Sequence, residues 1–258
     1  MTKILFVCHG NICRSPAAEF VFRSLAKKAG LQDQFEVASA ATSSEEIGNP
    51  VYPPMRRVLE ARGYSCEGKT ARRIRRADYD YYDLIIGMDD ENRWNLRRFY
   101  DGDPEGKLHD LMEYTPHPEE IPDPWYTRDF AGALDAIEYG CERLLTALTG
   151  VVLIDFSSCG EISELYAELR DKMDWEPWYG SNLDALYDIL TGLPHHGSTF
   201  VFTMPEEDAP AEVRLVANRI RAVFDEAEKY LASGEESPAE EAAGALTPEN
   251  ETEEDLTE

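Results

Sequence analysis

The chain of 258 residues lacks the cysteine pattern of a disulfide-bonded or zinc-binding protein. Its five cysteines, Cys8, Cys13, Cys66, Cys141 and Cys159, are an odd number and show no repeated C-x-x-C spacing. Disulfide frameworks and structural zinc sites both need cysteines in matched sets. We therefore expect reduced thiols and no bound metal.

Long apolar runs are also missing. The longest are short pieces such as Ile4–Cys8 and Val151–Ile154, whereas a membrane-spanning helix needs about 20 apolar residues. The N-terminal residues contain neither the apolar stretch nor the small-residue cleavage site of a secretory signal. These absences predict a cytoplasmic protein that makes no contact with a membrane.

Basic side chains are scarce, 25 against 51 acidic ones, and the net charge is −26. The imbalance is −6 over residues 1–150, −10 over residues 151–233 and −10 over residues 234–258. Such an anionic chain repels nucleic acid and anionic lipid, so no nucleic-acid partner is expected. The 43 % of apolar residues can still form a core, which excludes global disorder.

Apolar runs alternate with helical patterns in the first half of the chain. The spacing predicts strands at residues 3–7, 35–38, 83–88 and 107–112, and helices at residues 16–29, 54–62, 91–99 and 130–148. Strands that are apolar almost throughout indicate burial on both faces. We therefore predict an α/β fold with a four-stranded parallel sheet and helices on both faces over residues 1–150.

The pattern restarts after Gly150, which indicates a second, smaller α/β domain over residues 151–233. Strands are predicted at residues 151–156 and 199–204, and helices at residues 163–173, 183–190 and 211–231. Residues 234–258 hold ten acidic side chains and no aromatic one. That composition predicts a disordered acidic tail.

The loop between the first strand and the first helix, Val-Cys-His-Gly-Asn-Ile-Cys-Arg-Ser-Pro at residues 7–16, carries a pattern suited to phosphate chemistry. Cys8 becomes a good nucleophile if a helix N-terminus and a nearby cation lower the pKa of its thiol. Successive backbone N–H groups, with Gly10 allowing close approach, can hold a tetrahedral oxyanion. Arg14 offers a planar pair of donors to phosphate oxygens, and Ser15 can donate to the sulfur or cap the helix. The simpler interpretation is a strand-to-helix turn with a buried cysteine.

A candidate proton donor lies far along the chain, in Ile-Pro-Asp-Pro-Trp-Tyr at residues 121–126. Phosphoryl transfer through a cysteine needs an acid for the leaving oxygen, and the two prolines stiffen the loop that carries Asp123. Taken alone, an Asp-Pro pair most often marks a turn. Its functional interpretation therefore depends on Cys8 and Arg14.

These pieces, together with residues 39–42, 71–72 and 88–92, resemble the low-molecular-weight protein tyrosine phosphatases over about the first 150 residues. The resemblance implies a flavodoxin-like fold. It also implies an enzyme that hydrolyses a phosphotyrosine-containing protein or a small aryl phosphate without metal or cofactor. It implies that Cys8 forms a cysteinyl-phosphate intermediate, that Arg14 binds the phosphate, and that Asp123 is the general acid and then the base. Residues with implied phosphate-binding or loop-supporting roles are His9, Gly10, Asn11, Ile12, Cys13, Ser15 and Ser39.

The details of the resemblance bear on substrate and redox behaviour. Cys13 matches the family's second cysteine, which can pair with Cys8 on oxidation, although a buried apolar role fits it equally. Lys69 stands where a histidine is common, and residues 42–46 lack an aromatic of the cleft wall, which Trp125 or Tyr126 can supply. Phosphoarginine phosphatases tend to carry threonine where this chain has Ile12, so phosphotyrosine is favoured and phosphoarginine is the alternative.

A second constellation, at residues 175–190, places two carboxylates on one helical face. Asp184 and Asp188 are four residues apart and follow an aromatic loop that contains Trp178. The stretch resembles barstar-type ribonuclease inhibitors, which implies that Trp178, Asp184, Asp188 and Glu226 contact a basic ribonuclease or another cationic protein. The family's last strand has no counterpart before the acidic tail. A solvated acidic face is the simpler interpretation, and a wholly non-enzymatic interaction protein is the competing class.

Overall fold

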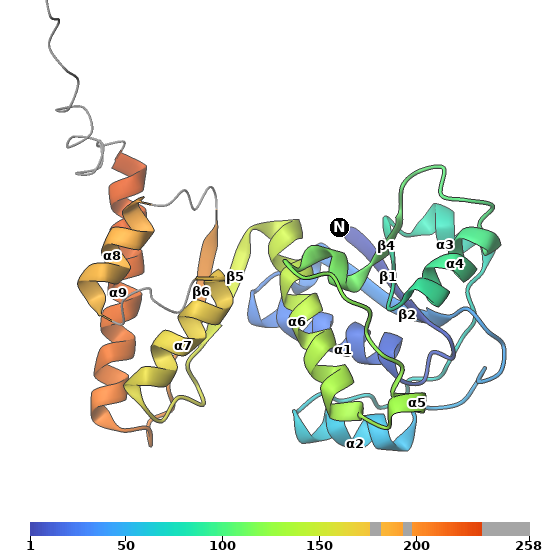
Figure 1. Ribbon diagram of the computed structural model, residues 1–258, viewed down its shortest axis with the longest axis horizontal. Helices are drawn as coiled ribbons and strands as arrows, with labels where there is room; N and C mark the ends of the chain where they lie inside the picture. The colour runs from blue at the N-terminus through green and yellow to red at the C-terminus, as the bar shows by residue number, and fades with distance from the viewer. Residues whose placement is uncertain (176–181, 193–197, 234–258) are drawn as a thin grey trace, which may run out of the picture. The chain divides into compact units, whose positions relative to one another are not determined.

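The computed structural model describes residues 1–175, 182–192 and 198–233 and separates into two compact units (Figure 1). The first unit is Met1–Leu153 and the second begins at Ile154. The predicted boundary lies at Gly150, where the long helix before it ends in a left-handed residue with φ of 71°. The boundary in the structure is three residues later because Leu153 packs against the core of the first unit.

The first unit contains every strand and helix that the spacing predicts, with ends shifted by a few residues. In chain order its elements are β1 (Thr2–Cys8), α1 (Arg14–Lys28), η1 (Gln32–Gln34), β2 (Phe35–Ala41), α2 (Pro53–Ala61), α3 (Arg76–Tyr81), β3 (Leu84–Gly87), α4 (Asp90–Phe99), β4 (Leu108–Asp110), η2 (Leu111–Tyr114), α5 (Pro124–Thr127) and α6 (Phe130–Thr149). The short helices α3 and α5 and the single 3₁₀ turns η1 and η2 are additional. They are too short for an apolar period to reveal.

The four strands form one parallel sheet in the order β2-β1-β3-β4. Cys8, the last residue of β1, pairs with Ala41, the last residue of β2. Because all strands run the same way, their C-terminal ends lie at one edge of the sheet. Strand β1 lies between β2 and β3, so the loop after β1 lies at a topological switch point, where α/β sheets bind ligands.

Helices cover both faces of this sheet, as predicted. Ile4 and Phe6 of β1 belong to the core cluster that includes residues of α1, α2 and α6. Their neighbours Leu5 and Val7 belong to a second cluster with residues of α3 and α4. Figure 1 shows the two groups of helices on opposite sides of the strands. Alternate residues of a strand point to opposite faces, so β1 is anchored on both sides and its last residue is held rigidly.

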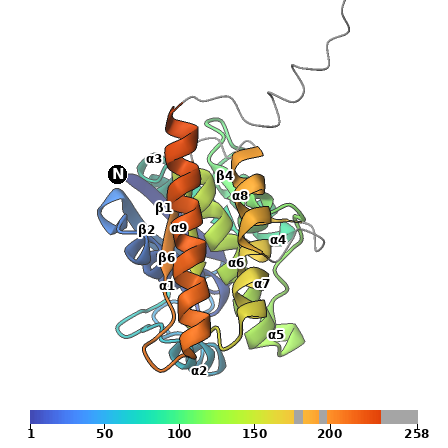
Figure 2. The same cartoon turned by 90° about the vertical axis from the view of Figure 1, so that its left-hand side faces the viewer.

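The second unit has few strands and a long final helix. Its elements are β5 (Val151–Asp155), which begins in the first unit, α7 (Ile162–Met173), α8 (Leu183–Gly192), β6 (Thr199–Thr203) and α9 (Ala211–Ser233). Among the described residues its sheet consists of β5 and β6. Helix α9 packs against α7 and α8 (Figure 2). No helix in the described part of the chain is long and apolar enough to cross a membrane.

Two predictions lie outside the described residues. They are the contact role of Trp178 and the disorder of residues 234–258.

Candidate active site

The loop predicted to bind phosphate connects the central strand β1 to helix α1. Strand β1 ends at Cys8 and α1 begins at Arg14, two residues before the predicted start. Asn11, in the middle of the loop, has a left-handed backbone with φ of 57°. Asparagine tolerates this conformation better than most residues, and it lets the loop curl around the end of the strand.

Cys8 lies at the floor of the site with its thiol beside a hydroxyl. The residue is 3 % exposed, and its Sγ is 3.0 Å from the Oγ of Ser15. Ser15 is in the first turn of α1 and is fully buried. A hydroxyl at this distance can donate to a thiolate and stabilise its charge.

Asn11 links the loop to strand β2 through buried hydrogen bonds. Its amide nitrogen donates to the Oγ of Ser15 at 2.9 Å and to the Oγ of Ser39 at 2.8 Å. Its amide oxygen accepts from the backbone N–H of Arg72 at 3.1 Å. Ser39 lies within β2, which extends three residues beyond the predicted end. These bonds satisfy the Asn11 side chain and hold the left-handed turn in place.

The polar network continues to a buried ion pair that sequence reasoning missed. The Oγ of Ser39 donates to Glu19 Oε2 at 2.6 Å, and the Lys69 Nζ contacts the same oxygen at 2.6 Å. Glu19 is 4 % exposed and also pairs with Arg23 at 2.9 Å. The available signal was its position four residues after Ser15, on the same face of α1.

Arg14 is buried and bonded to two carboxylates. Its two terminal nitrogens contact Asp89 Oδ2 at 2.5 Å and Asp123 Oδ2 at 2.6 Å. One of them also donates to the carbonyl of Ile121 at 2.9 Å. Burial alone lowers the pKa of Arg14, but the charges of Cys8, Asp89 and Asp123 outweigh it and raise the pKa. The guanidinium therefore stays charged throughout the working pH range.

The Nε of Arg14 has no partner among the described residues, although the side chain is only 2 % exposed. Buried N–H donors are nearly always paired, so this one is suited to donate to a group that enters the pocket. A tetrahedral anion fits this donor because a guanidinium can donate from two adjacent nitrogens at once.

Asp123 and Asp89 are each held by the helix that they begin. The second oxygen of Asp123 accepts from the backbone N–H of Trp125 at 2.9 Å, and that of Asp89 accepts from Asn92 at 2.7 Å. Asp123 thus lies beside Arg14, one of the two residues on which its functional interpretation depends. Asp89 was not singled out, although an aspartate between a strand and a helix was a capping signal.

Burial keeps the second loop cysteine protonated. The pKa of Cys13 is strongly raised by burial and further by the nearby charges of Cys8 and Asp123. Cys13 and Cys8 both line the pocket and neither is in a disulfide. Cys13 is therefore a neutral thiol beside the candidate nucleophile.

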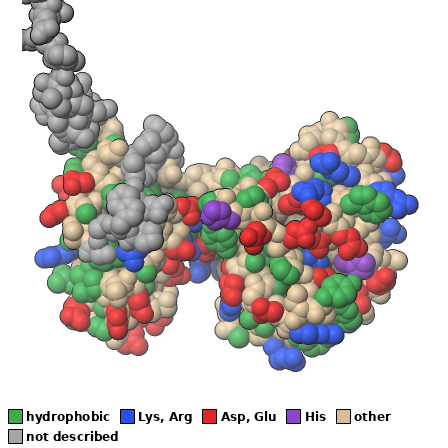
Figure 3. Space-filling view, viewed as in Figure 1, with side chains coloured by type: hydrophobic (Ala, Val, Ile, Leu, Met, Phe, Trp, Pro, Cys, Tyr) green, Lys and Arg blue, Asp and Glu red, His purple; other side chains and the backbone are tan. Residues whose placement is uncertain are grey.

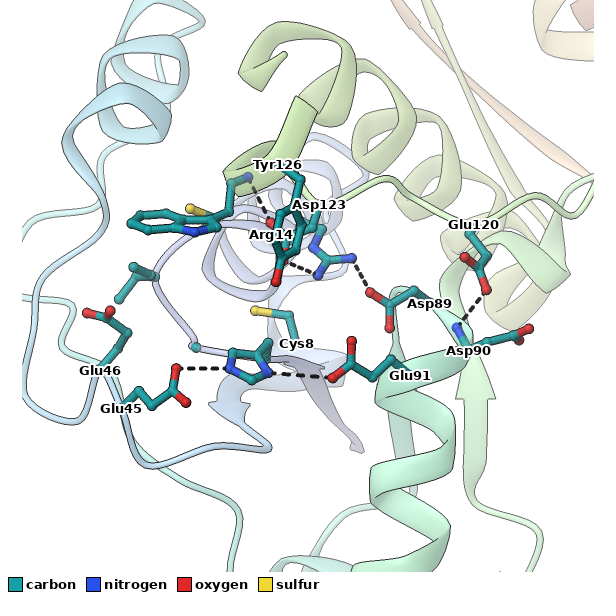
Figure 4. Close-up of a pocket in the computed structure, with 15 residues that line it drawn as sticks. Cys8, Arg14, Glu45, Glu46, Asp89, Asp90, Glu91, Glu120, Asp123 and Tyr126 are labelled. Carbon is teal, nitrogen blue, oxygen red and sulfur yellow. Dashed lines mark hydrogen bonds and ion pairs between the residues drawn. The ribbon is translucent and has the colours of Figure 1, made fainter. Parts of the chain in front are cut away.

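The pocket above Cys8 has a volume of about 420 Å³, and the candidate nucleophile, arginine and proton donor all line it (Figure 4). Cys8, His9, Gly10, Ile12, Cys13, Arg14 and Asp123 line it, and Asn11, Ser15 and Ser39 support it from behind. Trp125 and Tyr126 supply the aromatic wall, with the Trp125 ring 5.4 Å from that of Tyr52. The described residues hold no group of three or more His, Cys, Asp or Glu placed to bind a metal ion.

The predicted contact residues of the second unit lie on its surface. Asp184 and Asp188 are exposed on α8, and Glu226 is exposed on α9. The two helices pack together, with the ring of Tyr187 6.5 Å from that of Tyr230. The exposed carboxylates thus belong to two adjacent helices.

Two family models match the chain. The model of the low molecular weight phosphotyrosine protein phosphatases matches residues 3–152, and that of barstar, the barnase inhibitor, matches residues 149–241.

Similar proteins cover the first unit. The chain is 39 % identical over 150 residues to the low molecular weight protein-tyrosine-phosphatase YfkJ of Bacillus subtilis, which covers 57 % of this chain and 96 % of that protein. It is 32 % identical over 146 residues to PtpA of Staphylococcus aureus MRSA252, covering 56 % of this chain and 92 % of that one. The crystal structure of YfkJ matches with a TM-score of 0.55 at 38 % identity, covering 57 % of this chain and 94 % of that one. That of SP-PTP from Streptococcus pyogenes matches with a TM-score of 0.52 at 36 % identity, covering 57 % and 93 %.

Proposed function

Because the chain belongs to the low molecular weight phosphotyrosine protein phosphatase family, and is thus an enzyme of the protein-tyrosine-phosphatase class, we propose that residues 1–150 hydrolyse phosphotyrosine through a cysteinyl-phosphate intermediate. The observation that supports this mechanism is the convergence on one pocket. Asp123, 109 residues beyond Arg14, contacts the guanidinium that lies in the same pocket as Cys8.

In the first step the Cys8 sulfur attacks phosphorus and the bond from phosphorus to the phenolic oxygen breaks. The loop N–H groups and Arg14 stabilise the charge on the three non-bridging oxygens. The phosphate takes the Nε and one terminal nitrogen of Arg14, which releases the Asp123 carboxylate from its ion pair. The freed carboxylate takes up the proton of the entering phosphate monoanion. Asp123 then donates its proton to the leaving phenolic oxygen.

In the second step the Asp123 carboxylate takes a proton from water, and the water oxygen attacks the phosphorus of the intermediate. The bond from phosphorus to sulfur breaks, inorganic phosphate leaves, and the thiolate returns. Ser15 donates to the departing sulfur over the 3.0 Å separation. The proton on Asp123 leaves with inorganic phosphate, and the carboxylate pairs with Arg14 again.

Hydrolysis of a small aryl phosphate by wild type and by Cys8→Ser tests the mechanism. Cys8→Ser abolishes turnover but keeps phosphate binding, because most of the cradle is backbone. Cys159→Ser is the matched control, since that thiol is also buried but lies in the second unit. If wild type and Cys8→Ser both match the buffer rate, the competing class of a non-enzymatic interaction protein is correct.

The preference for phosphotyrosine over phosphoarginine is supported by the apolar and aromatic lining. Ile12, Trp125 and Tyr126 offer contact to a flat ring. Peptides that differ only in phosphotyrosine or phosphoarginine are compared by kcat/KM. A higher value for phosphoarginine contradicts this preference and leaves the cysteine mechanism standing.

For residues 151–233 we propose a separate protein-binding domain, followed by the acidic segment 234–258. The barstar family model and the exposed carboxylates of α8 and α9 support this proposal. Its partner is a small basic ribonuclease or a similarly cationic protein, attracted by the opposite charge.

Calorimetry of the full chain with a barnase-like ribonuclease tests this binding. Association slows as salt rises because salt screens the attraction. Asp188→Ala weakens binding more than Asp208→Ala, an exposed aspartate in the turn before α9. The absence of both heat and nuclease inhibition at micromolar concentration contradicts the inhibitor role.

A further inference from the structure

The mouth of the pocket is ringed by carboxylates that the mechanism does not use. Asp89 and Asp123 hold Arg14, but five more acidic residues line the same pocket, namely Glu45, Glu46, Asp90, Glu91 and Glu120. We call these five the acidic rim. Figure 4 shows Glu45 and Glu46 on one side of Cys8 and Arg14, and Asp90, Glu91 and Glu120 on the other. Figure 3 shows acidic side chains gathered near α4 on this face of the first unit.

The rim comes from three separate segments of the chain. Glu45 and Glu46 follow β2, Asp90 and Glu91 begin α4, and Glu120 lies in the loop before α5. A Cβ at Gly10 would lie 3.2 Å from the Cγ of Glu46, so that side chain packs directly on the phosphate loop. The fold therefore places these carboxylates around the site.

Two of the five rim carboxylates have uncharged donors as the partners of their hydrogen bonds. Asp90 pairs with Arg93, and His9 lies 3.2 Å from Glu45 and 4.0 Å from Glu91. Glu46 accepts from the amide of Asn49 at 2.7 Å, and Glu120 accepts from the backbone N–H of Asp90 at 2.9 Å. Amide donors carry no charge, so these bonds orient the last two carboxylates and leave them negative.

The centre of the pocket has the opposite electrostatic character. Among the described residues that line it, Arg14 is the one lysine or arginine, and its unpaired Nε offers a donor to an anion. The N-terminus of the 15-residue helix α1 adds a partial positive charge at the same place. An anion is thus favoured at the centre, and a second anion is disfavoured at the edge.

We propose that the acidic rim selects phosphotyrosine segments flanked by lysine or arginine and discriminates against segments flanked by aspartate or glutamate. The inference rests on the proposed function, since it assigns the substrate class of that same site. The phosphoryl group enters the centre, the tyrosine ring lies along Trp125 and Tyr126, and the neighbouring side chains of the substrate meet the rim. Opposite charges there favour the complex, and like charges oppose it.

Three phosphotyrosine peptides of equal length test the inference, with lysine, glutamine or glutamate at the two positions on each side of the tyrosine. We expect kcat/KM of the full chain to fall from lysine to glutamine to glutamate. Exposed ion pairs are individually weak, so the whole span is about tenfold at low salt. It shrinks as ionic strength rises, because salt screens exposed charges.

The Glu46→Gln, Glu120→Gln double variant removes the two carboxylates whose bonding partners are uncharged. For this variant we expect the ratio of kcat/KM for the lysine peptide to kcat/KM for the glutamate peptide to be about threefold smaller than for wild type. The matched control is the Asp33→Asn, Glu67→Gln double variant, which loses the same charge at exposed positions outside the pocket and keeps the wild-type ratio. A ratio within one variant is insensitive to the fraction of active protein.

The outcomes distinguish this inference from the function on which it rests. Equal kcat/KM for the three peptides, with a small aryl phosphate still hydrolysed, overturns the role of the rim alone. A higher value for the glutamate peptide also overturns it. If wild type does not hydrolyse the aryl phosphate, the proposed function fails.

Discussion

The guanidinium of Arg14 donates a hydrogen bond to the carboxylate of Asp123 in this structure. The contact of 2.6 Å between them satisfies a buried charge when no phosphate is bound. A buried arginine without an opposite charge is costly, so the site carries Asp89 and Asp123 as its resident anions. In the proposed mechanism a bound phosphate replaces part of that pairing and frees Asp123 for proton transfer.

Asp123→Asn separates substrates by leaving group. We expect at most about a tenfold loss of kcat for p-nitrophenyl phosphate, whose leaving phenol is acidic, and about a hundredfold loss or more for phenyl phosphate, which needs the proton. Asp129→Asn is the matched control, because Asp129 also accepts from a helix N-terminus, at Gly132, but does not line the pocket. Equal losses for both substrates contradict the role of Asp123 as acid.

Lys69 supports the phosphate loop from beneath through Glu19. Replacing it by leucine leaves Glu19 with Arg23 as its remaining charged partner, so we expect a loss of about 1–3 kcal/mol in the free energy of unfolding. Urea denaturation measures the loss. The control is Lys27→Leu, which replaces an exposed lysine of α1, the helix that carries Glu19. If Lys69→Leu is as stable as wild type, the ion pair contributes nothing to the fold.

At the scale of elements, the site is assembled from connections rather than from strands. Three connections each contribute one charged group: Arg14 comes after β1, Asp89 comes before α4, and Asp123 comes before α5. The guanidinium of Arg14 contacts both carboxylates. The sheet brings the first two together because β1 and β3 are neighbours and both end at the same edge. Helix α6 packs against α1 and against η2, the turn that precedes the third segment.

The connection from α4 to β4 depends on one carboxylate and is predicted to weaken in acid. Asp103 accepts from the Tyr79 hydroxyl at 2.7 Å and from the backbone N–H groups of Lys107 and Leu108 at 2.8 and 3.2 Å. Burial raises its pKa, but these three bonds outweigh burial and lower the pKa below the ordinary 3.8. The charged form is thus the stabilised one.

The sign of the pH effect follows from that lowered pKa. The stabilisation by Asp103 is fully present above the unfolded value near 3.8 and is lost as pH falls through the lower folded value. We expect Asp103→Asn to cost about 1 kcal/mol in the free energy of unfolding at pH 7 and less as pH falls below 3.8. Denaturation at a series of pH values checks this. A difference that grows in acid contradicts the assignment.

At the scale of the whole molecule, the chemistry and the strongest acidity belong to different units. Every residue that lines the pocket lies in the first unit. The net charge of residues 151–258 is −20, out of −26 for the whole chain. The relatives correspond to this first unit, since they match 57 % of this chain over 96 % of their own length in the case of YfkJ. The second unit is therefore an addition to an otherwise complete catalytic scaffold.

A shortened chain of residues 1–155 tests that independence. It keeps Leu153 and the whole of α6, so we expect kcat/KM for a small aryl phosphate within about twofold of the full chain. A chain of residues 1–128 is the control. It lacks α6, whose buried face packs on α1, so we expect it not to fold. Loss of activity in residues 1–155 shows that the second unit is needed by the first.

The sequence by itself determined the order of strands and helices and the loop that carries Cys8 and Arg14. Apolar periodicity and loop composition are local properties, so they can be recognised in a single segment. The parallel sheet was predicted from the alternation of strands and helices. In such a sheet the loop after β1 lies at the C-terminal edge, where ligands bind. The sequence also singled out Asp123 as the candidate proton donor before the family resemblance gave it the same role, but no local pattern indicated its contact with Arg14.

Tertiary structure alone decided which distant groups complete the site. Asp89 lies 75 residues from Arg14, and no periodicity signals that its carboxylate contacts a guanidinium. Glu19 looked like an ordinary helix glutamate until the packing of α1 on β2 buried it beside Ser39. The acidic rim likewise joins three segments that only the shared edge of the sheet brings together. Contacts of this kind depend on how elements pack, and packing is a property of the whole fold.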